Sequence, residues 1–503
     1  MFQRSRLALA AGAAGIATVL FGSLAAAAPA PGAPGAGDPY YPNAGNGGYD
    51  VSHYNIRLTY NPATDLLSGT TTISAKTTQE LSSFDLDFLL PIKSIRVNNL
   101  PAQTRTAAVG EVVVTPPRPL ANGADLTVVV QYEGTPSTVK DATGFTAWKK
   151  TPTTTLAVDE PDIAPWWFPS SNHPTDKATF DVSVAVPNGT EVISNGTFAG
   201  TTPQINGWTR WNWRSLKPQA TYLTYIVIGQ FEIRTQPAPN GQPIVTAYGE
   251  DLGDNAESAR ASIERTGEII EFESSVFGDY PFEAQGGVAS TGLNFALENQ
   301  TRPVYSDRFF RRGANTSVIS HELAHQWFGD SVSVQTWRNI WLNEGFATYA
   351  QYLWSEHENE GTAAEVAQYW YDFYPANDPF WQFVVAEPGS GNEFNGAVYD
   401  RGGITLQALR TKIGDDAFFT LLKTWTAQHR YGNATIEQFI ALAEKISGKP
   451  LFDFFQTWLF TKGKPAEGPN GPAPAGLSAK AAHAKPKSID QIQYTHEILA
   501  QQH

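Results

Sequence analysis

The sequence predicts an α+β multidomain protein, in which an N-terminal β-sandwich-like domain is followed by a mostly helical domain. Two changes in pattern support this prediction. Short alternating apolar and polar runs, separated by Asn, Gly and Pro, fill residues 48–240, whereas apolar residues recur at helical spacing over 241–462. A chain of 503 residues is also too long for one compact core, so at least two domains are expected.

The N-terminus has the pattern of an export signal. Arg4 and Arg6 precede an apolar run of Ala, Leu and Gly, and small residues at 25–28 offer cleavage sites. We therefore expect residues 1–28 to be a signal peptide and the mature protein to be secreted, with no stable membrane insertion after cleavage. An uncleaved anchor is the alternative, but Ala and Gly dilute the hydrophobicity of the run. Residues 29–47, rich in Pro, Ala, Gly and Asn, are expected to form a flexible linker.

Strand-like runs define the first folded domain, residues 48–240. Alternating segments at 53–58, 126–130 and 179–184 are examples, and turn sequences such as Pro-Asn-Gly at 187–189 separate them. Frequent short strands with turn signals are typical of a β-sandwich.

Helical periodicity begins after residue 248. Residues 256–277 are expected to form one amphipathic helix, and 287–305 a strand-like stretch. Further helices are expected at 340–357, 361–372, 401–412, 415–427, 435–446 and 451–461. Residues 463–503 are rich in Pro, Ala, Gly and Lys, which predicts a disordered tail that contains at most a short helix near 489–499.

The most informative motif is H-E-x-x-H at residues 321–325. On a helix, positions four residues apart share one face, so His321 and His325 can reach a single metal ion. Asn, Thr and Ser at 315–317 offer N-cap oxygens just upstream. Glu322 lies one position round the helix, where its carboxylate can touch a water on the metal without being a ligand.

The third metal ligand is expected to be a carboxylate. A metzincin would carry a further His six residues after His325, but that position is Ser331. Glu344 falls in a second apolar, helix-compatible stretch, and Gly345 beside it removes a side chain where one helix can press against another. We therefore expect one Zn²⁺ per chain, held by His321, His325 and Glu344. The alternative is that Glu344 is merely a solvated helix residue.

This ligand set predicts hydrolysis. Two His, one carboxylate and an open fourth position distinguish a catalytic zinc site from a structural one. Glu322 is expected to act as the general base, taking a proton from water and later handing it to the leaving nitrogen.

Composition limits the partners and the compartment chemistry. The chain has 35 Lys and Arg against 49 Asp and Glu, a formal charge of −14, which argues against nucleic acid as a partner. The local basic cluster of Arg308, Arg311 and Arg312 is interpreted as a solvated loop. No Cys is present, so disulfides are excluded.

Three further segments extend a resemblance to the gluzincin zinc aminopeptidase family, of the aminopeptidase N and leukotriene hydrolase type. The metal motif itself, H-E-x-x-H followed by eighteen residues and Glu, has the spacing of that family. Residues 295–299 (Phe-Ala-Leu-Glu-Asn) resemble its Gly-x-Met-Glu-Asn strand, and 398–402 (Val-Tyr-Asp-Arg-Gly) its Tyr-Glu-Lys-Gly segment. Residues 167–169, with Pro174 and Lys177, are similar to its Phe-Pro-Cys-x-Asp-x-Pro-x-x-Lys-Ala region.

The resemblance covers residues 48–462 and implies a β domain packed on a thermolysin-like zinc peptidase domain at 241–462, with the site between them. It implies that Glu298 binds the free α-amine of a peptide substrate. It also implies that Tyr399 is catalytic and donates a hydrogen bond to the tetrahedral oxyanion. The same strand would supply two more substrate-binding positions, Ala296 and Asn299.

The chain departs from the family pattern at several positions. Phe295 and Leu297 replace the family's Gly and Met, so the first side-chain pocket is expected to differ in shape. The position at which many members place a substrate-binding Gln is assigned here to Val158 or Asp159. The family's C-terminal helical domain is expected to be missing, which would leave the groove more open.

The leading hypothesis is a secreted zinc-dependent aminopeptidase that hydrolyses N-terminal peptide bonds. One alternative is a zinc endopeptidase with an open groove, which would release internal fragments. The other is a non-catalytic zinc-containing binding module. The presence of both Glu322 and Tyr399 argues against that module, because a structural site needs neither.

Overall fold

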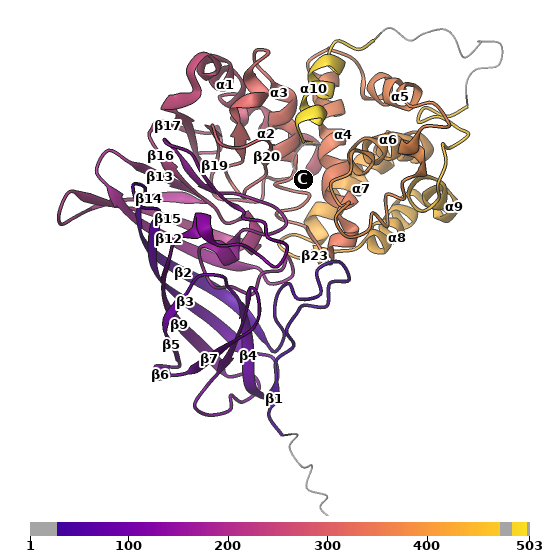
Figure 1. Cartoon of the computed structure of the whole chain (residues 1–503). Coiled ribbons are helices and arrows are strands. Elements are labelled where there is room, and N and C mark those ends of the chain that lie inside the picture. Colours follow the sequence, from indigo (N-terminus) through magenta and orange to yellow (C-terminus); the bar gives the residue numbers. More distant parts are fainter. Residues whose placement is uncertain (1–27, 473–484, 500–503) are drawn as a thin grey trace, which may run out of the picture.

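The computed structural model describes residues 28–472 and 485–499 (Figure 1). The signal peptide predicted for residues 1–28 lies outside the described residues, apart from its last position. Within the described part of the chain, no helix is both long and apolar enough to span a bilayer.

The first domain is built on an eight-stranded mixed sheet. Strand β2 (Tyr49–Asn61) illustrates why this sheet forms. Tyr54, Ile56 and Leu58 alternate with exposed residues, so their side chains point to one buried face. The spatial order of its strands is β14 (Thr197–Gln204), β15 (Trp208–Gln219), β12 (Ala178–Pro187), β2 (Tyr49–Asn61), β3 (Leu66–Thr77), β9 (Asp125–Gly134), β5 (Ile92–Val97), β6 (Leu100–Pro101).

Two four-stranded sheets complete this domain. One has the order β1 (Ala30–Pro31), β4 (Leu81–Asp87), β8 (Glu111–Thr115), β7 (Gln103–Ala108). The other has the order β10 (Trp148–Lys150), β11 (Thr155–Ala157), β16 (Ile226–Gly229), β13 (Glu191–Ser194). The predicted α+β class, with a β-rich domain followed by a helical one, is confirmed, and Figure 1 shows the two parts side by side.

The second domain begins with a sheet of its own. Its order is β17 (Phe231–Pro237), β18 (Pro243–Gly249), β19 (Gln285–Ser290), β21 (Val304–Ser306), β20 (Ala296–Leu297). Because β17 pairs with β18, the structural boundary precedes residue 231, earlier than the predicted 241. The strand-like stretch at 287–305 divides among the last three strands.

Most of the helices match their predicted ranges. An exception is 256–277, which forms two helices, α1 (Ala256–Ile263) and α2 (Thr266–Phe277). The Thr266 hydroxyl donates a hydrogen bond to the Ile263 carbonyl at 2.7 Å where the chain breaks. The remaining helices are α3 (Thr316–Ala324), α4 (Trp341–His357), α5 (Ala363–Phe373), α6 (Gly396–Ile413), α7 (Asp415–Gln428), α8 (Ile436–Ser447), α9 (Phe452–Phe455), which continues as a π-helical turn.

The segment predicted as a flexible linker, residues 29–47, is instead packed between the domains. The buried carboxylate of Asp38 accepts a hydrogen bond from the Trp337 backbone N–H at 2.8 Å. It also lies 3.2 Å from Nε2 of His173. His173 belongs to the first domain and Trp337 to the second, so one polar residue in a Pro/Gly-rich segment joins the two.

The tail contains the short helix that the sequence allowed near 489–499. Residues 489–499 form helix α10 (Ile489–Leu499), which packs against α3 beside α4 (Figure 1). Its apolar residues Ile489, Ile492 and Ile498 are buried. The disorder predicted for 463–503 therefore does not extend over α10, because an amphipathic stretch follows the Pro- and Ala-rich sequence.

Candidate active site

Helix α3 carries the first two metal-ligating side chains. The Asn315 side chain caps it by accepting a hydrogen bond from the Val318 N–H at 3.2 Å, as the sequence predicts. The helix ends at Ala324, and His325 follows with a helical backbone conformation. His321 and His325 therefore remain one turn apart, and both are buried.

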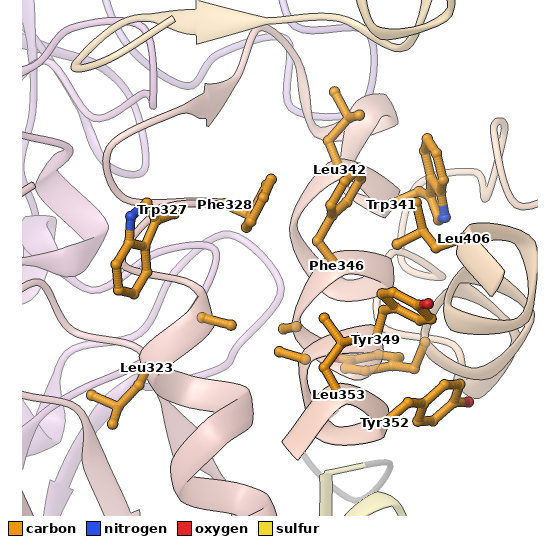
Figure 2. Packing of buried hydrophobic residues seen from close by; sticks show 14 of the residues in the cluster. Leu323, Trp327, Phe328, Trp341, Leu342, Phe346, Tyr349, Tyr352, Leu353 and Leu406 are labelled. Carbon is orange, nitrogen blue, oxygen red and sulfur yellow. The ribbon is translucent and has the colours of Figure 1, made fainter. Parts of the chain in front are cut away.

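Apolar packing fixes α3 against α4. Figure 2 shows Phe328, just after α3, facing Phe346 of α4. Their rings stack with centroids 4.5 Å apart and an angle of 19° between planes. Leu323 and Trp327 extend the α3 side of this core, and Leu342 and Leu353 extend the α4 side. Glu344 lies in the first turn of α4 and is held at a fixed distance from the two imidazoles.

Two glycines bring α6 close to α4. A Cβ atom on Gly402 of α6 would lie 2.8 Å from the Cα of Gly345, which allows no side chain at either position. The close packing predicted at Gly345 is thus present, and its partner is α6. This contact sets Tyr399 of α6 over His321, with ring centroids 5.9 Å apart and an angle of 16° between planes.

The three predicted ligands converge. Nε2 of His321 and Nε2 of His325 each lie 3.4 Å from the same Glu344 oxygen, Oε2. Ligand atoms of a tetrahedral zinc ion bound at about 2.0–2.1 Å would be roughly 3.3 Å apart. The spacing is therefore that of donors around an ion, and too long for ordinary hydrogen bonds.

The Nδ1 atoms of both imidazoles contact hydrogen-bond acceptors, as is typical of zinc-ligating histidines. Nδ1 of His321 lies 3.2 Å from Gln351 Oε1, and Nδ1 of His325 lies 3.0 Å from the Phe328 carbonyl oxygen. Both partners are acceptors, so each Nδ1 carries the proton and each Nε2 is free for a metal. The residues fit a zinc ion.

Electrostatics at the triad favour a bound cation. Burial lowers the pKa of His321 to about 4, so this imidazole is neutral at pH 7. Burial alone would raise the pKa of Glu344, but a positive charge on His325 and the contacts with both imidazoles lower it to about 2. The neighbouring carboxylates favour that charge on His325, and a metal ion bound at Nε2 would take the place of the proton. An anionic carboxylate thus faces a neutral imidazole at the position of the metal.

Two further carboxylates line the same space. Glu298, Glu322 and His325 each offer an atom within 4.8 Å of the others, and all three are buried. Burial raises the pKa of Glu322 well above its usual range, and its Oε1 has no hydrogen-bond partner among the described residues. The Tyr222 hydroxyl lies 3.4 Å from Glu298 Oε1 and orients that side chain.

A third carboxylate, Glu160, was missed by the sequence reasoning. Of the two positions assigned there, Val158 is fully buried and Asp159 forms an ion pair with Lys149. Glu160 is buried as well, and its Oε1 has no partner among the described residues. Burial and then the charge of Glu298 raise the pKa of Glu160, and the charges of Glu344 and Glu322 raise it further, so Glu160 faces the same group of carboxylates.

The contact that distinguishes Glu160 from its neighbour Asp159 involves a residue from another strand. Strands β10 and β11 pair antiparallel with Lys149 opposite Leu156, and this register brings Lys149 close to Asp159. Because Lys149 pairs with Asp159, the carboxylate that remains without a cationic partner is that of the next residue, Glu160. Knowledge of the strand pairing would have assigned the position to Glu160.

The remaining predicted positions support the site from behind. Ala296 pairs with Tyr305 in the short β20–β21 ladder. Asn299 donates from Nδ2 to the Leu223 carbonyl of the first domain at 3.1 Å. Gln326, just after α3, donates to the Glu298 backbone carbonyl at 2.8 Å. These bonds hold Glu298 against both the first domain and the metal helix.

A cavity lies at Pro161, the residue that follows Glu160. It has a volume of about 260 Å³ and is lined by residues from four separate parts of the chain, Tyr41, Pro161, Gly391, Asn392, Glu393, Phe394, Asn395 and Leu499. A smaller cavity next to it is lined by Tyr399 together with Asp400, His496 and Leu499. The larger cavity thus reaches Pro161, the residue after Glu160, and the smaller one reaches Tyr399.

Comparison with known proteins agrees with this arrangement. The chain matches the Peptidase M1 N-terminal domain over residues 51–223 and the Peptidase family M1 domain over residues 264–458. The two matches follow the division between the β-rich and helical domains. The metal triad lies within the second match.

Named relatives and solved structures lie at 25–28% identity. Aminopeptidase N of Streptomyces lividans is 27% identical over 59% of this chain, and human glutamyl aminopeptidase is 25% identical over 62%. These matches span only 36% and 34% of the relatives' own lengths.

Solved structures match over a larger share of both chains. A crystal structure of the M1 zinc metallopeptidase from Deinococcus radiodurans is 28% identical with a TM-score of 0.77, covering 88% of this chain and 100% of its own. A mutant of that metallopeptidase, bound to a Tyr-Ser-Ala substrate, is 27% identical with a TM-score of 0.76 over 87% of this chain and 100% of its own. Two domain matches, a complete His-His-Glu triad and this shared two-domain structure lead to one conclusion: the chain belongs to peptidase family M1.

Proposed function

We propose that this protein is a secreted zinc aminopeptidase that removes residues from the N-termini of peptides. The observation that carries the proposal is the pair of buried carboxylates, Glu160 and Glu298, beside the metal triad. Neither forms a salt bridge with Lys or Arg among the described residues. The site is therefore short of one positive charge, which the α-ammonium group of a peptide supplies.

Glu160 and Glu298 determine which end of a substrate is bound. Burial raises the pKa of both carboxyl groups, so a negative charge on either one is unfavourable unless a cation binds beside it. A peptide with a free amine provides that cation. An acetylated peptide does not, and it leaves two buried carboxylates without a partner.

Glu322 is the group that moves the proton. When bound, zinc supplies a Lewis acid and lowers the pKa of a water at the open position towards about 7. Oε1 of Glu322 is buried and has no hydrogen-bond partner among the described residues, so it is available to take the water's proton and later to release it to the leaving nitrogen.

Tyr399 is placed to stabilise the charge that develops on the substrate carbonyl. Burial and the surrounding carboxylates raise the pKa of its phenol well above the usual value, so the hydroxyl keeps its proton at neutral pH. A neutral donor in a buried site favours the oxyanion over the planar carbonyl. Because its ring stacks on His321, its position is coupled to that of the metal.

Secretion is proposed from the sequence of residues 1–28 alone. Two arginines precede an Ala/Leu-rich run and a set of small residues, which is the arrangement of a cleavable signal peptide. N-terminal sequencing of protein from the culture medium of a host cell tests this point. Recovery only from the cell interior would contradict it.

The activity is tested by digesting matched peptides with free and N-acetylated amino termini and identifying the products by mass spectrometry. We expect single residues to be released in order from the free peptides only. A chelator should stop the reaction and added zinc should restore it. Equal cleavage of both peptide sets, or internal fragments, would contradict the aminopeptidase proposal and favour an endopeptidase. An inert protein would favour a binding module.

A further inference from the structure

Helix α10 has no part in the function proposed above, yet one of its side chains reaches the metal site. Nε2 of His496 lies 2.8 Å from Oε1 of Gln351 on α4. The same oxygen lies 3.2 Å from Nδ1 of the metal ligand His321. A continuous line of contacts therefore runs from the C-terminal helix to the zinc position.

The donors and acceptors in this line can be assigned. The Gln351 amide group donates from Nε2 to the Ser317 hydroxyl at 2.7 Å, so its oxygen is the atom that faces the two imidazoles. An amide oxygen only accepts. His321 must therefore donate through Nδ1–H, which leaves Nε2 for the metal, and His496 must donate through Nε2–H.

His496 also links the two helices that carry the catalytic groups. Its Nδ1 lies 2.7 Å from Oδ1 of Asp400, the residue after Tyr399 on α6. The other oxygen of Asp400 accepts a hydrogen bond from the Tyr374 hydroxyl at 2.9 Å. One imidazole thus contacts α4, which holds Glu344, and α6, which holds Tyr399.

The helix that carries His496 is itself fixed on the metal helix. Oε1 of Gln491 accepts from the Ser317 backbone N–H at 3.1 Å, in the first turn of α3. Nδ2 of Asn315, the N-cap of α3, donates to the Thr495 hydroxyl at 3.1 Å. The position of α10 therefore depends on the N-terminus of α3.

We propose that His496 is a positioning residue of the metal site. It holds the Gln351 oxygen in place, and this oxygen in turn fixes the tautomer and the ring orientation of His321. Partners that hold the outer nitrogen of a ligating His typically change metal affinity by about 10- to 100-fold when they are removed. The inference rests on the zinc site of the proposed function and is independent of the peptide chemistry.

The test is the zinc dissociation constant of purified full-length variants, measured by competition with a chromophoric chelator. Gln351→Ala should weaken zinc binding by about 10- to 100-fold, since it removes the acceptor itself. His496→Ala should weaken it by a smaller factor, about 3- to 10-fold, because Gln351 remains but is no longer fixed. Gln493→Ala, which loses a bond only to Glu497 on the solvent side of the same helix, should bind zinc like wild type.

Two further variants separate positioning from simple stabilisation. In His496→Gln, the side-chain amide can still donate to Gln351, so zinc affinity should be partly restored relative to His496→Ala. In a Gln351→Ala background, adding His496→Ala should produce no further loss of affinity. Thermal unfolding of each zinc-free variant shows whether it is folded.

Three outcomes decide the matter. A graded loss of affinity with no additional effect in the double variant supports the inference. Wild-type affinity in a folded His496→Ala variant overturns it and leaves α10 a purely structural element. A wild-type protein that binds no zinc would contradict the proposed function itself, and the inference with it.

Discussion

The two sides of the active site are built in different ways. The metal side comes from one domain, with His321 on α3, His325 directly after it and Glu344 on α4, within 24 residues of sequence. The amine side comes from two domains, with Glu298 after β20 and Glu160 on a loop of the β-rich domain. The metal side lies in one short segment, so a sequence motif reveals it. The amine side is assembled by the packing of two domains, and no single motif contains it.

The difference also concerns what each half contributes. The metal side supplies the reaction, and its geometry is fixed by the core between α3, α4 and α6 (Figure 2). In the proposed function the amine side supplies the choice of substrate, and its geometry depends on how the two domains meet. Damage to the first half should therefore reduce turnover of every substrate, and damage to the second should alter selectivity.

The largest effect is expected from Glu322→Gln. Removal of the base should lower kcat by about 10²- to 10⁴-fold, since general acid–base catalysis contributes that much. Zinc content and thermal stability should stay at wild-type levels, because Glu322 is not a ligand. Steady-state kinetics with metal analysis checks this, and a variant that loses its zinc would show that Glu322 also holds the ion.

Tyr399→Phe should have the next largest effect. Loss of one donor to the oxyanion should lower kcat by about 10²- to 10³-fold while KM changes little. The ring remains, so its stacking on His321 should preserve zinc binding. A change confined to KM would argue that Tyr399 binds substrate without stabilising the transition state.

Glu160→Gln probes the amine side and should have a smaller effect that depends on the substrate. We expect kcat/KM for free peptides to fall by about 30-fold or more, in line with about 2 kcal/mol for a buried charge pair that loses one partner. Asp159→Asn is the matched control from the adjacent position, where the carboxylate already pairs with Lys149. Equal losses in both variants would contradict the assignment of Glu160.

The smallest effect concerns stability alone. Glu111 of β8 lies opposite Asp87 of β4, and burial followed by the charge of Asp85 raises its pKa to about 7. A carboxyl whose folded-state pKa is raised stabilises the protein below its unfolded-state pKa of about 4.3. That contribution is lost as the pH rises through about 7.

Glu111→Gln should therefore unfold at a higher temperature than wild type at pH 8, by an amount equivalent to about 1–3 kcal/mol. At pH 4 the difference should vanish or reverse. Differential scanning calorimetry across this pH range provides the measurement. Peptidase activity of the folded variant should equal that of wild type, since Glu111 does not line the metal site.

The contrast between the two halves also explains how far the sequence alone could lead. Residues 321–325 and Glu344 could be assigned because helical spacing converts sequence separation into geometry. Glu160 could not be distinguished from Asp159, because the deciding contact with Lys149 is made by strand pairing. A short helix near 489–499 could be anticipated, but the contact of His496 with Gln351 could not, because it depends on the packing of α10 against α3.

Every catalytic role assigned above depends on one zinc ion held by His321, His325 and Glu344, and anomalous X-ray diffraction at the zinc absorption edge would locate that ion. We expect one strong anomalous peak per chain, about 2.0–2.2 Å from Nε2 of both imidazoles and from the Glu344 carboxylate. A peak elsewhere in zinc-loaded crystals, or one that lacks any of these three ligands, would contradict it.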